Sequence, residues 1–81
     1  MQIDAAKALI ADHLAVDVDA VRDDAIFSSD LGADSLDMIE LAMRFEEELD
    51  IAIDDNETEA CETVRDALNL VQSKVIARQA A

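Results

Sequence analysis

The chain has 81 residues with 20 acidic and only 6 basic side chains, so its formal net charge at pH 7 is −14. This charge excludes nucleic acids and anionic membranes as natural partners and favours basic protein surfaces. The length predicts one domain over residues 1–81, and abundant Ala, Leu, Glu and Asp without proline favour helices. A single cysteine excludes an internal disulfide. Neither a basic leader nor a long apolar segment is present, so we expect a cytoplasmic monomer that does not insert into membranes.

A first helix is predicted over residues 3–14, because apolar side chains recur there at helical spacing. Its core face comprises Ala6, Leu9, Ile10 and Leu14. His13 lies at the end of this helix with no second histidine and no nearby cysteine, so a metal site is not expected there. We expect His13 to be exposed to solvent or to cap the helix.

Residues 15–34 are predicted to form a long loop with a short helical turn near residues 19–22, since a structureless loop of this length is unusual. Apolar side chains are expected to anchor the loop in the core: Val16, Val18, Val21, Ile26, Phe27 and Leu31. The aspartates of the loop do not form a calcium-binding motif. Counted from Asp17, position 6 is Arg22 instead of glycine and position 12 is Ser28 instead of glutamate.

The only glycine, Gly32, marks a turn that needs a positive φ just before the second helix. Asp34 is suited to cap that helix. Asp37, three residues later, is placed to accept a hydrogen bond from the backbone N–H of Asp34. Ser35 then lies in the first turn, where free N–H groups and the positive end of the helix dipole suit an attached phosphodiester. Asp34 and Asp37 would repel that anion, and a cationic partner enzyme would explain their presence.

The second helix, over residues 35–49, carries two apolar stripes. The core stripe comprises Met38, Leu41, Ala42, Phe45 and Leu49. The second stripe, Leu36, Ile39 and Met43, is turned about 120° from the first and is edged by Glu40, Glu46 and Glu47. We interpret the second stripe as a surface that docks a partner protein; the alternative is that another helix or the preceding loop covers it.

Acidic residues are concentrated in residues 30–62, which contain 13 of the 20 acids and a single base, Arg44. A basic partner would be attracted to this segment, and salt would weaken the association. Arg44 has two interpretations. It pairs with Glu40 or Glu48, four residues away on either side, or it discriminates among partners.

An extended connector with Ile51 and Ile53 is predicted next, followed by a short third helix over residues 57–61 and a last helix over residues 63–76. Thr63 opens the last helix with Asp66 three residues on, and residues 76–81 are expected to fray. The buried positions of this helix are Val64, Ala67, Leu68, Val71 and Val75. Cys61 is expected to be a buried, inert thiol. The fold class is therefore all-α: a small four-helix bundle, with three main helices, one short helix and a long first loop.

The segment DLGADSLDMIELAMRFEEELDI resembles the prosthetic-group site and second helix of the acyl carrier proteins of type II fatty acid and polyketide synthesis. Weaker similarity covers residues 5–75. The resemblance implies that a phosphopantetheinyl transferase attaches 4′-phosphopantetheine from coenzyme A to Ser35. The terminal thiol of that arm would carry acyl groups as thioesters, and the protein itself would not be an enzyme.

The resemblance also implies a surface for acyl transferases, ketosynthases and other acyl-processing enzymes with basic patches. Its residues would be Asp34, Leu36, Asp37, Ile39, Glu40, Met43, Glu46 and Glu47. The chain departs from the family at Ile53-Asp54-Asp55, where Ile-Pro-Asp is common. This difference and Arg44 leave open whether the protein serves fatty acid synthesis or a specialised pathway.

Two other functions compete with that of a carrier. An enzyme would need a base to activate Ser35, and His13 is the only histidine. An acidic, non-catalytic protein-interaction module would explain the charge but gives Ser35 no role. Within the carrier interpretation, Phe27, Leu36 and Met38 are expected to line a pocket that shelters the acyl chain.

Overall fold

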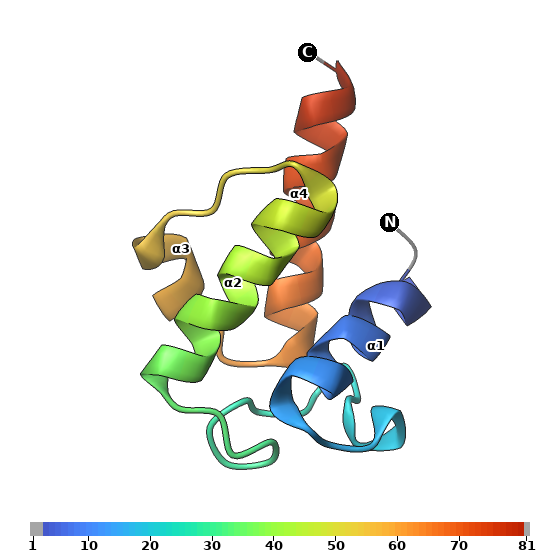
Figure 1. The fold of residues 1–81 in the computed structure, drawn as a ribbon, viewed down its shortest axis with the longest axis vertical. Coiled ribbons are helices and arrows are strands. Elements are labelled where there is room, and N and C mark those ends of the chain that lie inside the picture. The colour runs from blue at the N-terminus through green and yellow to red at the C-terminus, as the bar shows by residue number, and fades with distance from the viewer. Residues whose placement is uncertain (1–2, 81) are drawn as a thin grey trace.

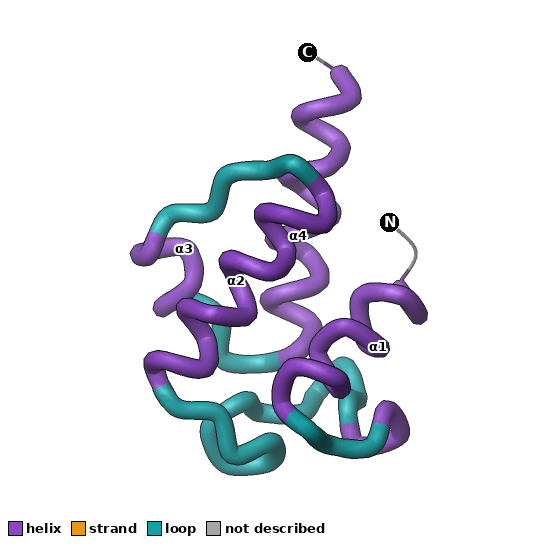
Figure 2. Tube along the Cα trace, viewed as in Figure 1, coloured by secondary structure: helices purple, strands orange, loops and turns teal. Residues whose placement is uncertain are grey.

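The computed structural model describes residues 3–80 and has the predicted fold class (Figure 1). Its elements are α1 (Ile3–Leu14), a 3₁₀ turn η1 (Val18–Ala20), α2 (Ser35–Leu49), α3 (Asp55–Glu59) and α4 (Val64–Ala80). The bounds of α1 and α2 agree with those predicted. The long loop lies at one end of the bundle, and α4 extends beyond the other helices at the opposite end (Figure 2). None of the described helices has the length and apolar character that a membrane span requires.

The core is built from aliphatic side chains and two phenylalanines. Ile10, Val21 and Val64 are its largest fully buried side chains, and Phe27 and Phe45 are each 2% exposed. The predicted core faces of α1 and α4 are buried, except that Leu14 and Val75 are only partly buried against the cluster. A core with only these two aromatic rings among its described residues depends on many small contacts, each of which contributes little alone.

The loop is anchored at fewer positions than predicted. Val21, Phe27 and Leu31 are buried, whereas Val18 and Ile26 are 51% and 42% exposed. Val18 belongs to η1, which contains no buried residue. Ile26 lies in extended backbone that pairs with Thr63 as an isolated bridge. Successive side chains of extended backbone point to opposite sides, so Phe27 points inward and Ile26 outward.

The bounds of α3 and α4 differ from the prediction. The carboxylate of Glu57 accepts a hydrogen bond from the backbone N–H of Asp54 (3.1 Å), so α3 begins at Asp55, two residues earlier than predicted. Helix α4 begins at Val64, and Thr63 caps it by accepting from the N–H of Asp66 (3.3 Å). Hydrogen bonds from Thr63 and Glu62 lower the pKa of Asp66.

The predicted fraying of residues 76–81 was wrong for residues 76–80, which continue α4. No glycine or proline interrupts this segment, and Arg78 pairs with Asp50 beyond the end of α2 (3.2 Å). This contact joins the projecting part of α4 to the end of α2, although both side chains are exposed. Residue 81 lies outside the described residues.

Candidate functional site

A rigid turn precedes Ser35. Gly32 has a φ of +67°, as predicted for a turn that only glycine adopts easily. The carboxylate of Asp30 accepts from the N–H of Ile26 (2.8 Å), and the N–H of Ala33 donates to the carbonyl of Phe27 (2.8 Å). These bonds close the loop on itself and fix the point from which α2 starts.

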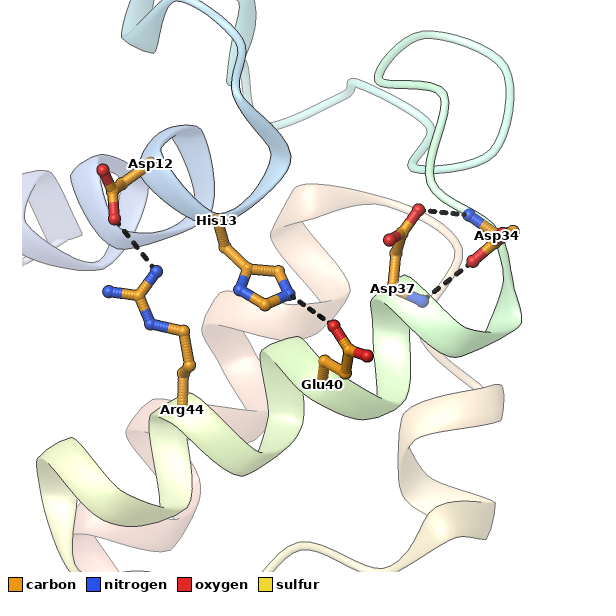
Figure 3. A network of polar contacts seen from close by, with 6 residues as sticks. All are labelled: Asp12, His13, Asp34, Asp37, Glu40 and Arg44. Carbon is orange, nitrogen blue, oxygen red and sulfur yellow. Dashed lines mark hydrogen bonds and ion pairs between the residues drawn. The ribbon is translucent and has the colours of Figure 1, made fainter.

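The start of α2 is a reciprocal cap. Asp34 Oδ1 accepts from the N–H of Asp37 (2.8 Å), and Asp37 Oδ2 accepts from the N–H of Asp34 (3.1 Å) (Figure 3). Both predicted capping residues are therefore in place, and each uses one carboxylate oxygen within the protein. Ser35 is the first residue of the helix, and it is exposed.

Ser35 borders an open groove of about 550 Å³ between the loop, α2 and α3. Its apolar lining includes Phe27, Met38, Ile39 and Cys61, and Ser28 lies in the same groove. No lysine, arginine or histidine lines it. The groove therefore provides space beside the Ser35 hydroxyl, and the charged side chains that line it are the carboxylates Asp34, Glu59 and Glu62.

A narrower cavity of about 30 Å³ lies deeper, between α2, α3 and α4. It shares Met38, Thr58 and Cys61 with the groove, so these three side chains separate the interior from the surface beside Ser35. Leu36 lines neither space, and its predicted place in an acyl pocket is wrong. The side chain of Leu36 points outward from α2 and is 61% exposed.

The outer face of α2 is uncovered in the described structure. Ile39 is 37% and Met43 54% exposed, so with Leu36 they form an exposed strip that neither the loop nor another described helix covers. Glu40 and Glu47 are exposed beside this strip. Glu46 is half-buried, and its carboxylate accepts from the N–H of Ile53 (3.2 Å), so it also holds the connector after α2.

Two side chains of α1 reach α2, and neither contact was predicted (Figure 3). Arg44 Nη1 donates to Asp12 Oδ2 at 3.0 Å. The predicted pairing with Glu40 or Glu48 is wrong because Arg44 lies on the side of α2 that faces α1. The side chain of His13 is only 14% exposed, with Nε2 4.0 Å from the Glu40 carboxylate, so His13 is neither solvated nor a cap.

Cys61 is half-buried, not fully buried as predicted. Its Sγ donates to the carbonyl of Glu57 (3.4 Å). Burial raises the pKa of its thiol, and the nearby carboxylates of Asp66 and Glu57 raise it further. Cys61 is therefore a poor nucleophile, in agreement with the prediction of an inert thiol.

Within residues 3–80, no group of three or more potential metal ligands is brought together. The sequence reasoning identified the turn, the cap and the exposed strip. It missed Asp12, which lies 32 positions from Arg44 and has no local signal. A cation isolated in an acidic helix was the one indication that a distant carboxylate was needed.

Comparison with known proteins gives a match to a family model and matches to many curated proteins. The family model described as "Phosphopantetheine attachment site" matches residues 4–71. A curated relative, the acyl carrier protein of Thermosynechococcus vestitus, is 48% identical over 71 residues, which are 88% of this chain and 88% of that protein. The match to the family model extends over α1, α2 and α3 and the first part of α4.

Proposed function

Since the chain belongs to the phosphopantetheine-attachment family, and within it to the acyl carrier proteins, we propose that Ser35 is the residue that bears the 4′-phosphopantetheine arm. The observation that carries this assignment is the position of Ser35, exposed in the first turn of α2 and beside an open groove. Ser28 lines the same groove but lies in the loop, away from any helix start.

The surroundings of Ser35 fit a phosphodiester. The positive end of the α2 dipole favours a negative group at this residue. The carboxylates of Asp34 and Asp37 are turned to backbone N–H groups, which partly offsets their repulsion of such a group. When attached, the arm supplies a thiol to which an acyl group is bound as a thioester.

In this proposal the protein performs no catalysis. Its residues position the arm and present it to other enzymes, which raises the effective concentration of the acyl group at their active sites. An external phosphopantetheinyl transferase attaches the arm to Ser35.

We assign the outer face of α2 to the docking of acyl-processing enzymes, among them acyl transferases and ketosynthases. Leu36, Ile39 and Met43 supply exposed apolar contacts. The acids around them, Asp34, Asp37, Glu40, Glu46 and Glu47, complement a basic patch on the enzyme. Charge complementarity of this kind speeds encounter and makes it sensitive to salt.

The groove and the inner cavity together offer a route for an acyl chain from Ser35 into the bundle. The cavity of about 30 Å³ holds about one water molecule. A longer acyl chain therefore requires the side chains between groove and cavity to move, and Met38 adapts most easily because it is unbranched. NMR spectra of the apo and acylated forms should differ at Met38, Leu70 and Val71; changes limited to residues 32–37 would contradict this route.

The attachment is tested by intact mass after incubation with coenzyme A and a broad-specificity phosphopantetheinyl transferase. The wild type and Ser28→Ala should each gain one phosphopantetheine, whereas Ser35→Ala should gain none. Ser28→Ala is a matched control because it removes a hydroxyl from the same groove. If the wild type gained nothing, the acidic, non-catalytic interaction module would become the better interpretation.

A further inference from the structure

Arg44 is the only base in residues 30–62, and it lies in α2 beside Met43 of the exposed strip. Its neighbours one turn away on the helix are Glu40 and Glu48, yet its guanidinium is directed to Asp12 of α1 (Figure 3). In the part of the chain that the structure describes, this is the only hydrogen bond of its side chain. The side chain is 36% exposed, so part of the guanidinium faces the solvent from which a partner approaches.

The pair contributes little to stability, because the Asp12 side chain is 76% exposed and such ion pairs are well screened by water. The effect of this pair on the binding of a partner is larger than its effect on stability. A guanidinium has five N–H donors in a fixed fork, and the contact with Asp12 uses one nitrogen. Positive charge and free donors therefore remain on the edge of the strip that faces α1.

The opposite edge of the strip has a different charge. Asp55, Glu59 and Glu62 are exposed along and after α3, and the sequence has no base between residues 45 and 64. Lys74, which reaches this region from α4, is already paired with Glu57 (2.9 Å). The docking face is thus acidic on the α3 side, whereas on the α1 side Arg44 offsets part of the negative charge of Asp12 and Glu40.

We propose that Arg44 is a specificity-determining residue of the docking face, an inference that rests on the proposed function. It selects against enzymes whose basic residues lie opposite the α1 edge and leaves enzymes that place them opposite α3 unaffected. Asp12 is a positioning residue: it holds Arg44 toward α1 and compensates part of its charge. A partner matched to this face has basic residues opposite α3 and a neutral or acidic group opposite Arg44.

Two variants of the same ion pair test the proposal. Arg44→Gln removes the cation, and Asp12→Asn leaves the cation uncompensated, while both abolish the ion pair. The KM of a phosphopantetheinyl transferase with a uniformly basic docking patch should fall about two- to fivefold for Arg44→Gln and rise by a similar factor for Asp12→Asn, with kcat unchanged. Arg22→Gln is the charge-matched control, since Arg22 is exposed in the loop near η1, and its KM should equal that of the wild type.

Opposite changes in KM cannot come from loss of the ion pair, because both variants lose it. The differences in KM between the variants and the wild type should become smaller as the salt concentration is raised, since salt screens exposed charges. Equal KM values for the two variants, or shifts in the same direction, would overturn the role of Arg44 while loading of Ser35 continued. Absence of loading in the wild type would instead overturn the proposed function, and this inference with it.

Discussion

Backbone conformation at single residues sets the ends of the helices and the turn before Ser35. In the described chain, Ala15, Gly32 and Asp50 have positive φ values of 56°, 67° and 53°. Ala15 and Asp50 follow the last residues of α1 and α2, where the chain must reverse direction. A left-handed conformation costs a residue with a Cβ atom roughly 1 kcal/mol, and glycine adopts it without that cost.

Exchanging alanine and glycine at two of these positions should change stability in opposite directions. Gly32→Ala should lower the free energy of unfolding by about 1 kcal/mol, from backbone strain alone, because no atom lies within 4 Å of the added Cβ. Ala15→Gly should raise it by about 0.5–1 kcal/mol. Urea denaturation measures both, and a stabilising Gly32→Ala would contradict the assigned turn.

At the scale of the helices, α2 has apolar side chains on two faces, one in the core and one exposed. Leu41 and Phe45 are each 2% exposed and belong to the core, whereas Leu36 and Met43 are more than half exposed. An apolar side chain that stays exposed to water on a helix contributes no buried apolar area to the stability of the fold. The proposed docking of a partner would account for this exposed apolar face.

Replacing Met43 by glutamine should separate binding from stability. The free energy of unfolding should stay within about 0.5 kcal/mol, since the side chain is 54% exposed. The KM of the transferase should rise about fivefold, equivalent to about 1 kcal/mol of lost binding. Ile76→Gln is the control, because Ile76 is 64% exposed on α4, outside the docking face. An equal rise in KM for the two variants would argue against a defined docking strip.

Local signals explain why most elements could be predicted. The cap of Asp34 and Asp37 joins residues three apart, and the apolar spacing of α1 and α2 repeats within each helix. The contact between Arg44 and Asp12 joins different helices, and its geometry depends on how α1 and α2 pack. The alternation that buries Phe27 and exposes Ile26 depends likewise on pairing with Thr63, which is distant in sequence. Non-local packing thus set the features that the sequence did not predict.

For the whole molecule, charge repulsion opposes folding. Most bases are already used in ion pairs, such as Lys7 with Asp23 (2.7 Å) and Lys74 with Glu57 (2.9 Å), and these lower the pKa of both carboxyl groups. With a net charge of −14, most acids have no compensating cation. The folded chain holds these charges closer together than the unfolded chain does.

Salt should therefore stabilise the protein. Raising the sodium chloride concentration from a few millimolar to 0.5 M shortens the electrostatic screening length to a few Å. If this removes about 1 kcal/mol of charge repulsion from the folded state, Tm should rise by about 4–8 °C in a domain of this size. Divalent cations should act at lower concentrations. Calorimetry or circular dichroism at several salt concentrations measures the effect, and a Tm independent of salt would contradict a concentrated acidic surface.

The central claim is that Ser35, and no other serine, carries the arm. Its most direct test is fragment-ion mass spectrometry of the protein loaded by the transferase, read across the segment that contains Ser28, Ser29 and Ser35. The account predicts that the added phosphopantetheine mass appears only on fragments that include Ser35. The same mass on a fragment that ends before Asp34 would contradict it, and would move the attachment point from the start of α2 into the loop.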